Sequence, residues 1–101
     1  MIDSRMQQLF KRMVELGASD LHLTAGSPPT MRINEDLRPE DQAPLKGEET
    51  RAMAYESLNP QQIKTFERDL EMDMSFGLDG LGRFRVNVFM QRGSVSVAIR
   101  L

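Results

Sequence analysis

The sequence contains no cysteine, which excludes disulfide bonds and thiolate chemistry and fits a reducing compartment. No stretch approaches the roughly 18 apolar residues that a membrane helix needs, and the N-terminus lacks the apolar region of a signal peptide. The phosphate-binding patterns G-x-x-x-x-G-K-S/T and G-x-G-x-x-G are absent, as is the nucleophile pattern G-x-S-x-G. We therefore expect a cytoplasmic chain that catalyses no reaction by itself.

Acidic residues are missing from the last part of the chain, although the net charge is −2. Residues 1–34 hold four basic and three acidic side chains, residues 35–79 hold five and twelve, and residues 80–101 hold four arginines and no acid. The overall charge excludes a general nucleic-acid binder. The basic end segment predicts a positively charged face, which either meets the acidic middle segment or binds an anionic partner.

Length and composition predict one domain. At 101 residues, with 40% hydrophobic and 28% charged side chains, the chain suits a single modest core. Predicted helices and strands fall in separate runs, which favours the α+β class with a largely antiparallel sheet. The sequence stops at Arg100-Leu101 within an apolar–polar alternation, and we therefore expect a fragment of a longer protein.

Three helices are predicted. Ser4 and Gln7 form a capping box before the first, which Gly17 ends. The second runs from residue 47 or 48 to 58, and the third starts at an Asn59 N-cap. The apolar residues at helical spacing are expected to face the core. They are Met6, Leu9, Phe10, Met13 and Val14 in the first helix, and Ile63, Phe66 and Leu70 in the third.

Alternating apolar and polar residues predict short strands separated by turns. The strands are expected at residues 20–24, 30–34, a brief return near 37, 72–76, 83–91 and 94–101. The turns are expected at residues 26–29, 34–36, 77–82 and 92–93, and residues 39–47 are expected to form a loop.

The last two strands form a hairpin whose register follows from its apolar residues. A two-residue turn at Arg92-Gly93 makes every inward-facing pair apolar, and a slip of one residue would turn the whole set outward. The predicted inward pairs are Met90–Val95, Val88–Val97, Val86–Ile99 and Phe84–Leu101.

The same register places Arg85 opposite Arg100 on the polar face, with Arg83 one step along. Opposed like charges cost about 0.2–1 kcal/mol across a strand pair. Two explanations remain open. Carboxylates from the acidic segment, such as Asp73, offset the repulsion, or a bound anion does, because the planar fork of arginine suits phosphate oxygens.

His22 is the only histidine, and it shares a strand face with Asp20. Two potential ligands are too few for a typical metal site. A structural hydrogen bond is therefore the favoured role of His22, and no metal is expected.

Two segments together resemble the N-terminal domain of the type IV pilus retraction ATPases, the PilT family. The first is Ala18-Ser19-Asp20-Leu21-His22-Leu23, followed by Pro28-Pro29-x-x-Arg32. The second is Leu81-Gly82-Arg83-Phe84-Arg85-Val86-Asn87-Val88-Phe89-Met90-Gln91-Arg92-Gly93. The resemblance covers essentially the whole chain, and PilU-like relatives and the wider secretion-ATPase superfamily share much of this pattern.

The resemblance implies that residues 1–101 are a single PAS-like domain preceding a RecA-like ATPase domain that is absent from this chain. It also implies a homohexamer, in which ATP binds between the two domains with Mg²⁺ at the missing one. Arginines of the N-terminal domain would reach the ATP phosphates. That role falls on Arg83 and Arg85 in the basic family motif, and by proximity on Arg92 and Arg100.

The resemblance implies further partners and leaves two alternatives. The partners are RecA-like domains of its own and neighbouring subunits and the pilus machinery at the inner membrane, with no nucleic acid. The parent would be an ATPase of twitching motility, whereas this chain holds no catalytic residue. The motif Ser19–Leu23 receives only a structural or interface role. A stand-alone PAS-type sensor and an interaction module without a nucleotide role remain alternatives, although apolar inward positions disfavour the sensor.

Overall fold

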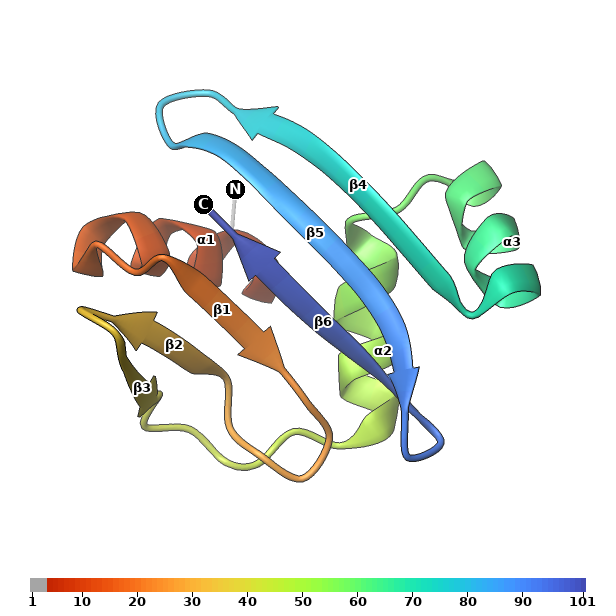
Figure 1. The fold of residues 1–101 in the computed structure, drawn as a ribbon, viewed down its shortest axis with the longest axis horizontal. Coiled ribbons are helices and arrows are strands. Elements are labelled where there is room, and N and C mark those ends of the chain that lie inside the picture. The colour runs from red at the N-terminus through yellow and green to blue at the C-terminus, as the bar shows by residue number, and fades with distance from the viewer. Residues whose placement is uncertain (1–3) are drawn as a thin grey trace.

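The computed structural model describes residues 4–101, which form three helices and one sheet of six strands (Figure 1). The helices are α1 (Arg5–Leu16), α2 (Gly47–Glu56) and α3 (Pro60–Asp69). The strands are β1 (Asp20–Leu23), β2 (Thr30–Ile33), β3 (Asp36–Pro39), β4 (Glu71–Leu78), β5 (Gly82–Gln91) and β6 (Ser94–Arg100). All neighbouring strands are antiparallel, so the predicted α+β class is confirmed.

Local sequence signals fix the start of α1 and of α3. Ser4 accepts a hydrogen bond from the Gln7 amide and donates its own amide to the Gln7 side chain. Asn59 and Gln62 make the same reciprocal pair before α3. Each box satisfies amides that a helix start would otherwise leave unpaired. Gly17 ends α1 in the left-handed region at φ 67°, as predicted.

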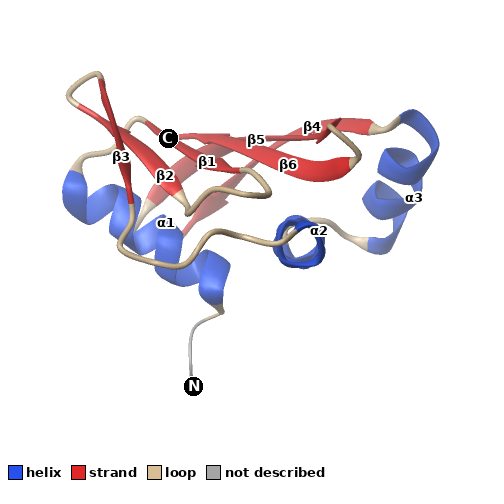
Figure 2. Ribbon diagram, turned by 90° about the horizontal axis from the view of Figure 1, so that it is seen from below, coloured by secondary structure: helices blue, strands red, loops and turns tan. Residues whose placement is uncertain are grey.

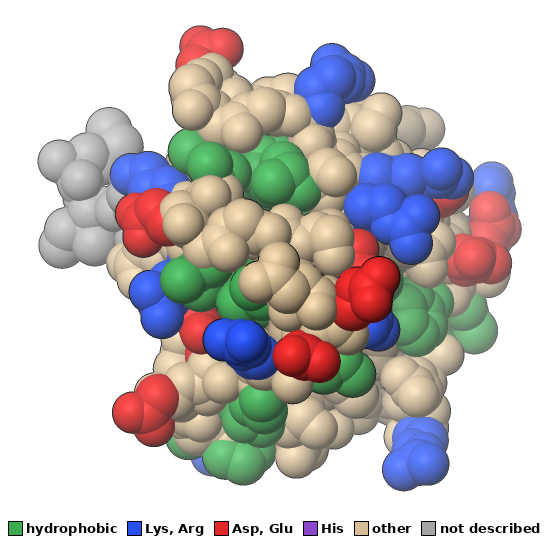
Figure 3. All heavy atoms as spheres, turned by 60° about the vertical axis from the view of Figure 1, so that its left-hand side comes forward, with side chains coloured by type: hydrophobic (Ala, Val, Ile, Leu, Met, Phe, Trp, Pro, Cys, Tyr) green, Lys and Arg blue, Asp and Glu red, His purple; other side chains and the backbone are tan. Residues whose placement is uncertain are grey.

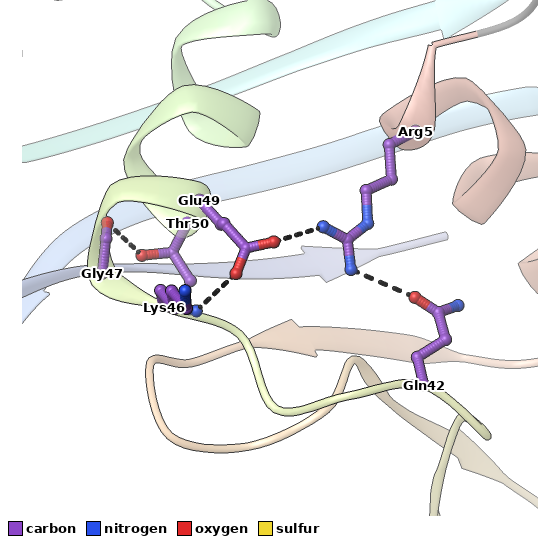
Figure 4. A network of polar contacts seen from close by, with 6 residues as sticks. All are labelled: Arg5, Gln42, Lys46, Gly47, Glu49 and Thr50. Atoms are coloured by element: carbon purple, nitrogen blue, oxygen red, sulfur yellow. Dashed lines mark hydrogen bonds and ion pairs between the residues drawn. The ribbon is translucent and has the colours of Figure 1, made fainter.

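A polar network ties the start of α2 to α1 (Figure 4). Arg5 Nη1 lies 2.8 Å from Glu49 Oε2, and Arg5 Nη2 donates to Gln42 Oε1 at 3.2 Å. The other Glu49 oxygen accepts the Lys46 amide at 3.0 Å. The Arg5 hydrogen bond, helped by that amide, lowers the pKa of Glu49. The ionised carboxylate therefore joins two helices and the loop before α2.

The strand order β3-β2-β1-β6-β5-β4 brings the first predicted motif beside the last strand. Asp20 of β1 pairs with Arg100 of β6, and His22 pairs with Ala98. The predicted hairpin register is confirmed from Gln91–Ser94 through Arg85–Arg100. The sheet therefore joins segments that are far apart in the sequence.

The helices formed by residues 4–101 cover one face of this sheet only (Figure 2). In Figure 2, α1 and α2 lie below the strands and α3 lies beyond the β4 end, while no described helix covers the opposite face. The Phe84 ring of β5 lies 4.7 Å from the Phe10 ring of α1, between their centroids. Alternate residues of β5 and β6 fill the core because the strand period sends every second side chain to the covered face. The fully or nearly buried members are Phe84, Val86, Val88, Val95, Val97 and Ile99.

Three side chains expected in the core are exposed. Leu70 is 54% exposed because it ends α3 in the left-handed region, at φ 60°, and turns away from the packed side of the helix. Met90 and Leu101 are 38% and 44% exposed, since they lie at the two ends of the hairpin, beyond the strand positions that the helices cover. Leu101 is also outside β6, so the predicted Phe84–Leu101 pair is not part of the ladder.

Some element ends also differ from prediction. α2 stops at Glu56, with Ser57 as its cap, rather than reaching Leu58. β4 continues to Leu78, so the turn before β5 is shorter than the predicted 77–82 segment. The shift at β4 arises because its pairing with β5 extends through Gly77 and Gly82, two glycines that favoured a turn in the sequence.

The surface around α1 carries both charge signs. In Figure 3, which brings the left-hand side of Figure 1 forward, Lys and Arg side chains are interspersed with Asp and Glu. Arg12 of α1 forms an ion pair with Glu40, with 2.8 Å between Nε and Oε1. None of the described helices is long and apolar enough to cross a membrane.

Candidate functional site

The uncovered face of the sheet carries a row of charged side chains across neighbouring strands. Arg85 of β5 lies opposite Arg100 of β6, which in turn lies opposite Asp20 of β1. Asp20 is followed by Arg32 of β2. The register that buries the apolar residues therefore also places three arginines and one aspartate in a line.

A shallow hollow of about 330 Å³ opens along this row and along the residues beside it on the same strands. Its wall combines charged and polar side chains from four adjacent strands, and includes Asp20, His22, Asp73, Arg85, Asn87 and Arg100. The hollow is open to solvent.

Arg85 is paired with Asp73 of β4. Arg85 Nη2 lies 2.8 Å from Asp73 Oδ2, and Nε donates to Oδ1 at 3.4 Å. This hydrogen bonding lowers the pKa of Asp73 and raises the pKa of Arg85. The side chains are 69% and 47% exposed, so solvent screens the pair strongly. In this structure, therefore, a carboxylate offsets the repulsion between the opposed arginines, which is the first of the two explanations left open by the sequence.

Asp20 holds two arginines. Its Oδ1 lies 3.4 Å from Arg100 Nε and its Oδ2 lies 3.3 Å from Arg32 Nε. Arg32 also donates to the Glu35 carbonyl at 3.1 Å. The Asp20 side chain is only 16% exposed. Asp20 is thus the anchor of this part of the row, a role that the sequence interpretation did not assign to it or to Arg32.

Arg83 lies two residues before Arg85 and therefore on the same face. It is exposed, and within residues 4–101 it makes no ion pair. Four arginines and two aspartates, with Arg32 and Arg83 included, give this group of side chains a net charge of +2.

Arg92 does not belong to this group. It occupies the β5–β6 turn with φ 51°, next to Gly93 at φ 79°. At about 3.3 Å per residue along a strand, the seven residues from Arg85 separate their backbones by roughly 23 Å. The expectation that all four arginines share one polar face is therefore wrong for Arg92, because the turn removes it from the strand alternation.

His22 and Asp20 point to the same face, as predicted. The expected structural hydrogen bond of the His22 ring is not found among residues 4–101. In the same range, no three or more His, Asp or Glu side chains are grouped to hold a metal ion. What this face offers instead is a set of guanidinium groups, which bind carboxylates and phosphates through paired donors.

Comparison with known proteins shows that this chain is similar in sequence to part of two type IV pilus ATPases. It is 44% identical over 84 residues to the type IV pilus retraction ATPase PilT of Pseudomonas aeruginosa, and 39% identical over 94 residues to the type IV pilus ATPase PilU of the same species. These matches cover 83% and 93% of this chain but 24% and 25% of the relatives. The chain thus spans about a quarter of the length of the curated relatives it matches. No family model matches it.

The fold agrees with the sequence match. A crystal structure of the pilus retraction motor PilT with bound ADP matches with a TM-score of 0.88 and 42% identity, over 98% of this chain and 29% of that chain. The resemblance predicted from the two motifs is therefore confirmed.

Proposed function

We propose that this chain, which is an N-terminal domain of the PilT family, supplies arginines to the phosphates of an ATP molecule held mainly by a RecA-like domain outside the chain. Arg83, Arg85 and Arg100 are the residues that carry this role. The RecA-like domain, its P-loop and its Mg²⁺ belong to the remainder of the protein, either in the same subunit or in a neighbouring subunit of a homohexamer.

One observation carries the proposal: three arginines lie close together on the face of the sheet that the domain's own helices leave open. Their guanidinium groups can give paired hydrogen bonds to phosphate oxygens. Arg83 has no ion-pair partner among residues 4–101, and the partners of Arg85 and Arg100 hold them in exposed positions. Arg92 is left out of the set because of its distance.

The wider setting of the proposal follows the relatives. One of them is named a retraction ATPase and a matching structure contains ADP. We place the whole protein in the cytoplasm, at the pilus machinery of the inner membrane, where ATP turnover would power pilus retraction in twitching motility. The PAS-like domain itself would assemble subunits and respond to nucleotide without binding nucleic acid. A γ-phosphate gives Arg85 contacts that ADP lacks, so the domain position can follow the nucleotide state.

The test is the ATPase activity of the full-length protein carrying Arg85→Ala. Loss of an arginine that stabilises transferred phosphate costs about 10³–10⁵ in turnover in other phosphoryl-transfer enzymes, and we expect a reduction of that order. Arg68→Ala is the matched control, because Arg68 is similarly exposed and is paired to Asp69 at 2.8 Å. Near-wild-type turnover of Arg85→Ala in a folded hexamer would overturn the proposal.

The interaction-module alternative is favoured by one observation, namely that Arg85 and Arg100 already have carboxylate partners in their own domain. Under that alternative, Arg83→Glu combined with Arg85→Glu would disturb hexamer assembly, measured by light scattering. The nucleotide response of any remaining hexamer would be unchanged. Under our proposal the nucleotide response is lost even where assembly persists.

A further inference from the structure

We propose that Asp73 acts as an internal competitor for the phosphate: its carboxylate occupies the Arg85 guanidinium until nucleotide displaces it. This inference rests on the proposed function of Arg85 and deepens it. It assigns Asp73 the part of setting how readily the arginine face accepts a phosphate.

The first support is geometric. Asp73 takes two donors of Arg85, Nε at 3.4 Å and Nη2 at 2.8 Å, one on each carboxylate oxygen. Those two donors form the edge of the guanidinium that would also bind two oxygens of a phosphate group. A phosphate that binds Arg85 through this edge therefore competes with the Asp73 carboxylate for the same two donors.

The second support is the contrast between the two aspartates of the row. Asp20 is largely covered and holds both Arg32 and Arg100, so its removal would release two side chains at once. Asp73 lies on β4, at the edge of the sheet, is about half exposed, and holds Arg85 alone. Its ion pair is the one that can break at low cost, since exposed pairs are weak and screened. Asp20 thus holds Arg32 and Arg100 in place, whereas Asp73 can release Arg85 to a phosphate.

The third support is charge. An approaching phosphate meets the negative Asp73 beside Arg85 as well as the arginine itself. Breaking the pair leaves the Asp73 carboxylate in water, where its exposure lets it be hydrated. Arg85 then turns from a carboxylate to a phosphate without either charge being left buried.

The experiment is a double-mutant cycle in the full-length protein, with affinity for the ATP analogue AMP-PNP measured by calorimetry. Asp73→Asn removes the competing charge, and we expect AMP-PNP to bind about two- to fivefold more tightly, the range set by an exposed ion pair. In an Arg85→Ala background the same substitution should change affinity by less than about 1.5-fold, because the group it competes for is gone. Asp73→Ser is a second variant with the same expectation.

Asp69→Asn is the matched control. Asp69 is 48% exposed and pairs with Arg68 at 2.8 Å, nearly the same exposure and distance as Asp73 with Arg85. The Asp69→Asn substitution should leave the affinity for AMP-PNP unchanged. Unchanged or weaker binding in both Asp73 variants, with Arg85→Ala still weakening binding, would overturn this inference and leave the proposed function standing. If the single variant Arg85→Ala bound AMP-PNP as tightly as wild type, both this inference and the proposed function would be overturned.

Discussion

Arg85 and Arg100 face each other across β5 and β6 on the side of the sheet that no described helix covers. Each is held by one carboxylate, Asp73 for Arg85 and Asp20 for Arg100. The Arg85–Asp73 pair is exposed on both sides and contributes little to stability, whereas the Asp20 partner of Arg100 is largely covered. The two faces of the hairpin therefore differ: the apolar face packs in the core, while the arginines of the other face stay exposed.

The first prediction concerns the apolar face. Phe84 is 1% exposed and packs against the rings of both Phe10 and Phe76. Phe84→Ala should lower the free energy of unfolding by about 3–5 kcal/mol, measured by urea denaturation, because it leaves a cavity. The control Leu101→Ala should cost well under 1 kcal/mol, since Leu101 is 44% exposed. Similar costs for the two variants would contradict this account of the core.

The second prediction separates Arg92 from the other arginines. Arg92 has φ 51° in a two-residue turn, a region that asparagine tolerates better than arginine. Arg92→Asn should raise the free energy of unfolding, by up to about 1 kcal/mol. It should not alter nucleotide affinity. A fall in affinity comparable to that of Arg85→Ala would show that the turn also contacts the nucleotide.

The third prediction is a pH dependence. The Arg5 hydrogen bond lowers the pKa of Glu49, so the ionised form stabilises the fold. This stability is fully present above the usual glutamate pKa, about 4.3, and is lost as the pH falls through the lower folded-state value. Glu49→Gln should therefore destabilise the protein at pH 7, with the difference from wild type shrinking below about pH 4.

The control for that pH series is Glu48→Gln, because Glu48 makes no ion pair within residues 4–101. The free energy of unfolding of Glu48→Gln should change with pH in the same way as that of wild type. A constant difference between Glu49→Gln and wild type at all pH values would mean that the charge of Glu49 is not what links α1 and α2.

Local signals in the sequence were sufficient for much of the fold. The boxes at Ser4–Gln7 and Asn59–Gln62 involve residues three apart, so they can be predicted without knowledge of the rest of the chain. The hairpin register could be predicted because one placement alone makes the inward pairs apolar. The opposition of Arg85 and Arg100 followed directly from it.

What could not be predicted depends on contacts between distant segments or on where the covering helices end. The pairing of Asp20 with Arg100 requires β1 beside β6, and those residues are far apart in the sequence. The alternation of apolar and polar residues predicts that Asp20 and His22 share a face, but it does not predict which residues of other strands lie beside them. The exposure of Leu70 depends on a left-handed residue that is not a glycine, for which the sequence has no clear signal.

The most direct measurement is a structure of the full-length protein with AMP-PNP bound. The account predicts an Arg85 guanidinium nitrogen about 2.7–2.9 Å from a phosphate oxygen, as in other charge-assisted hydrogen bonds, with Asp73 released from it. A nucleotide-bound structure in which Arg85 still lies on Asp73, and in which Arg83, Arg85 and Arg100 all lie away from the phosphates, would contradict the account.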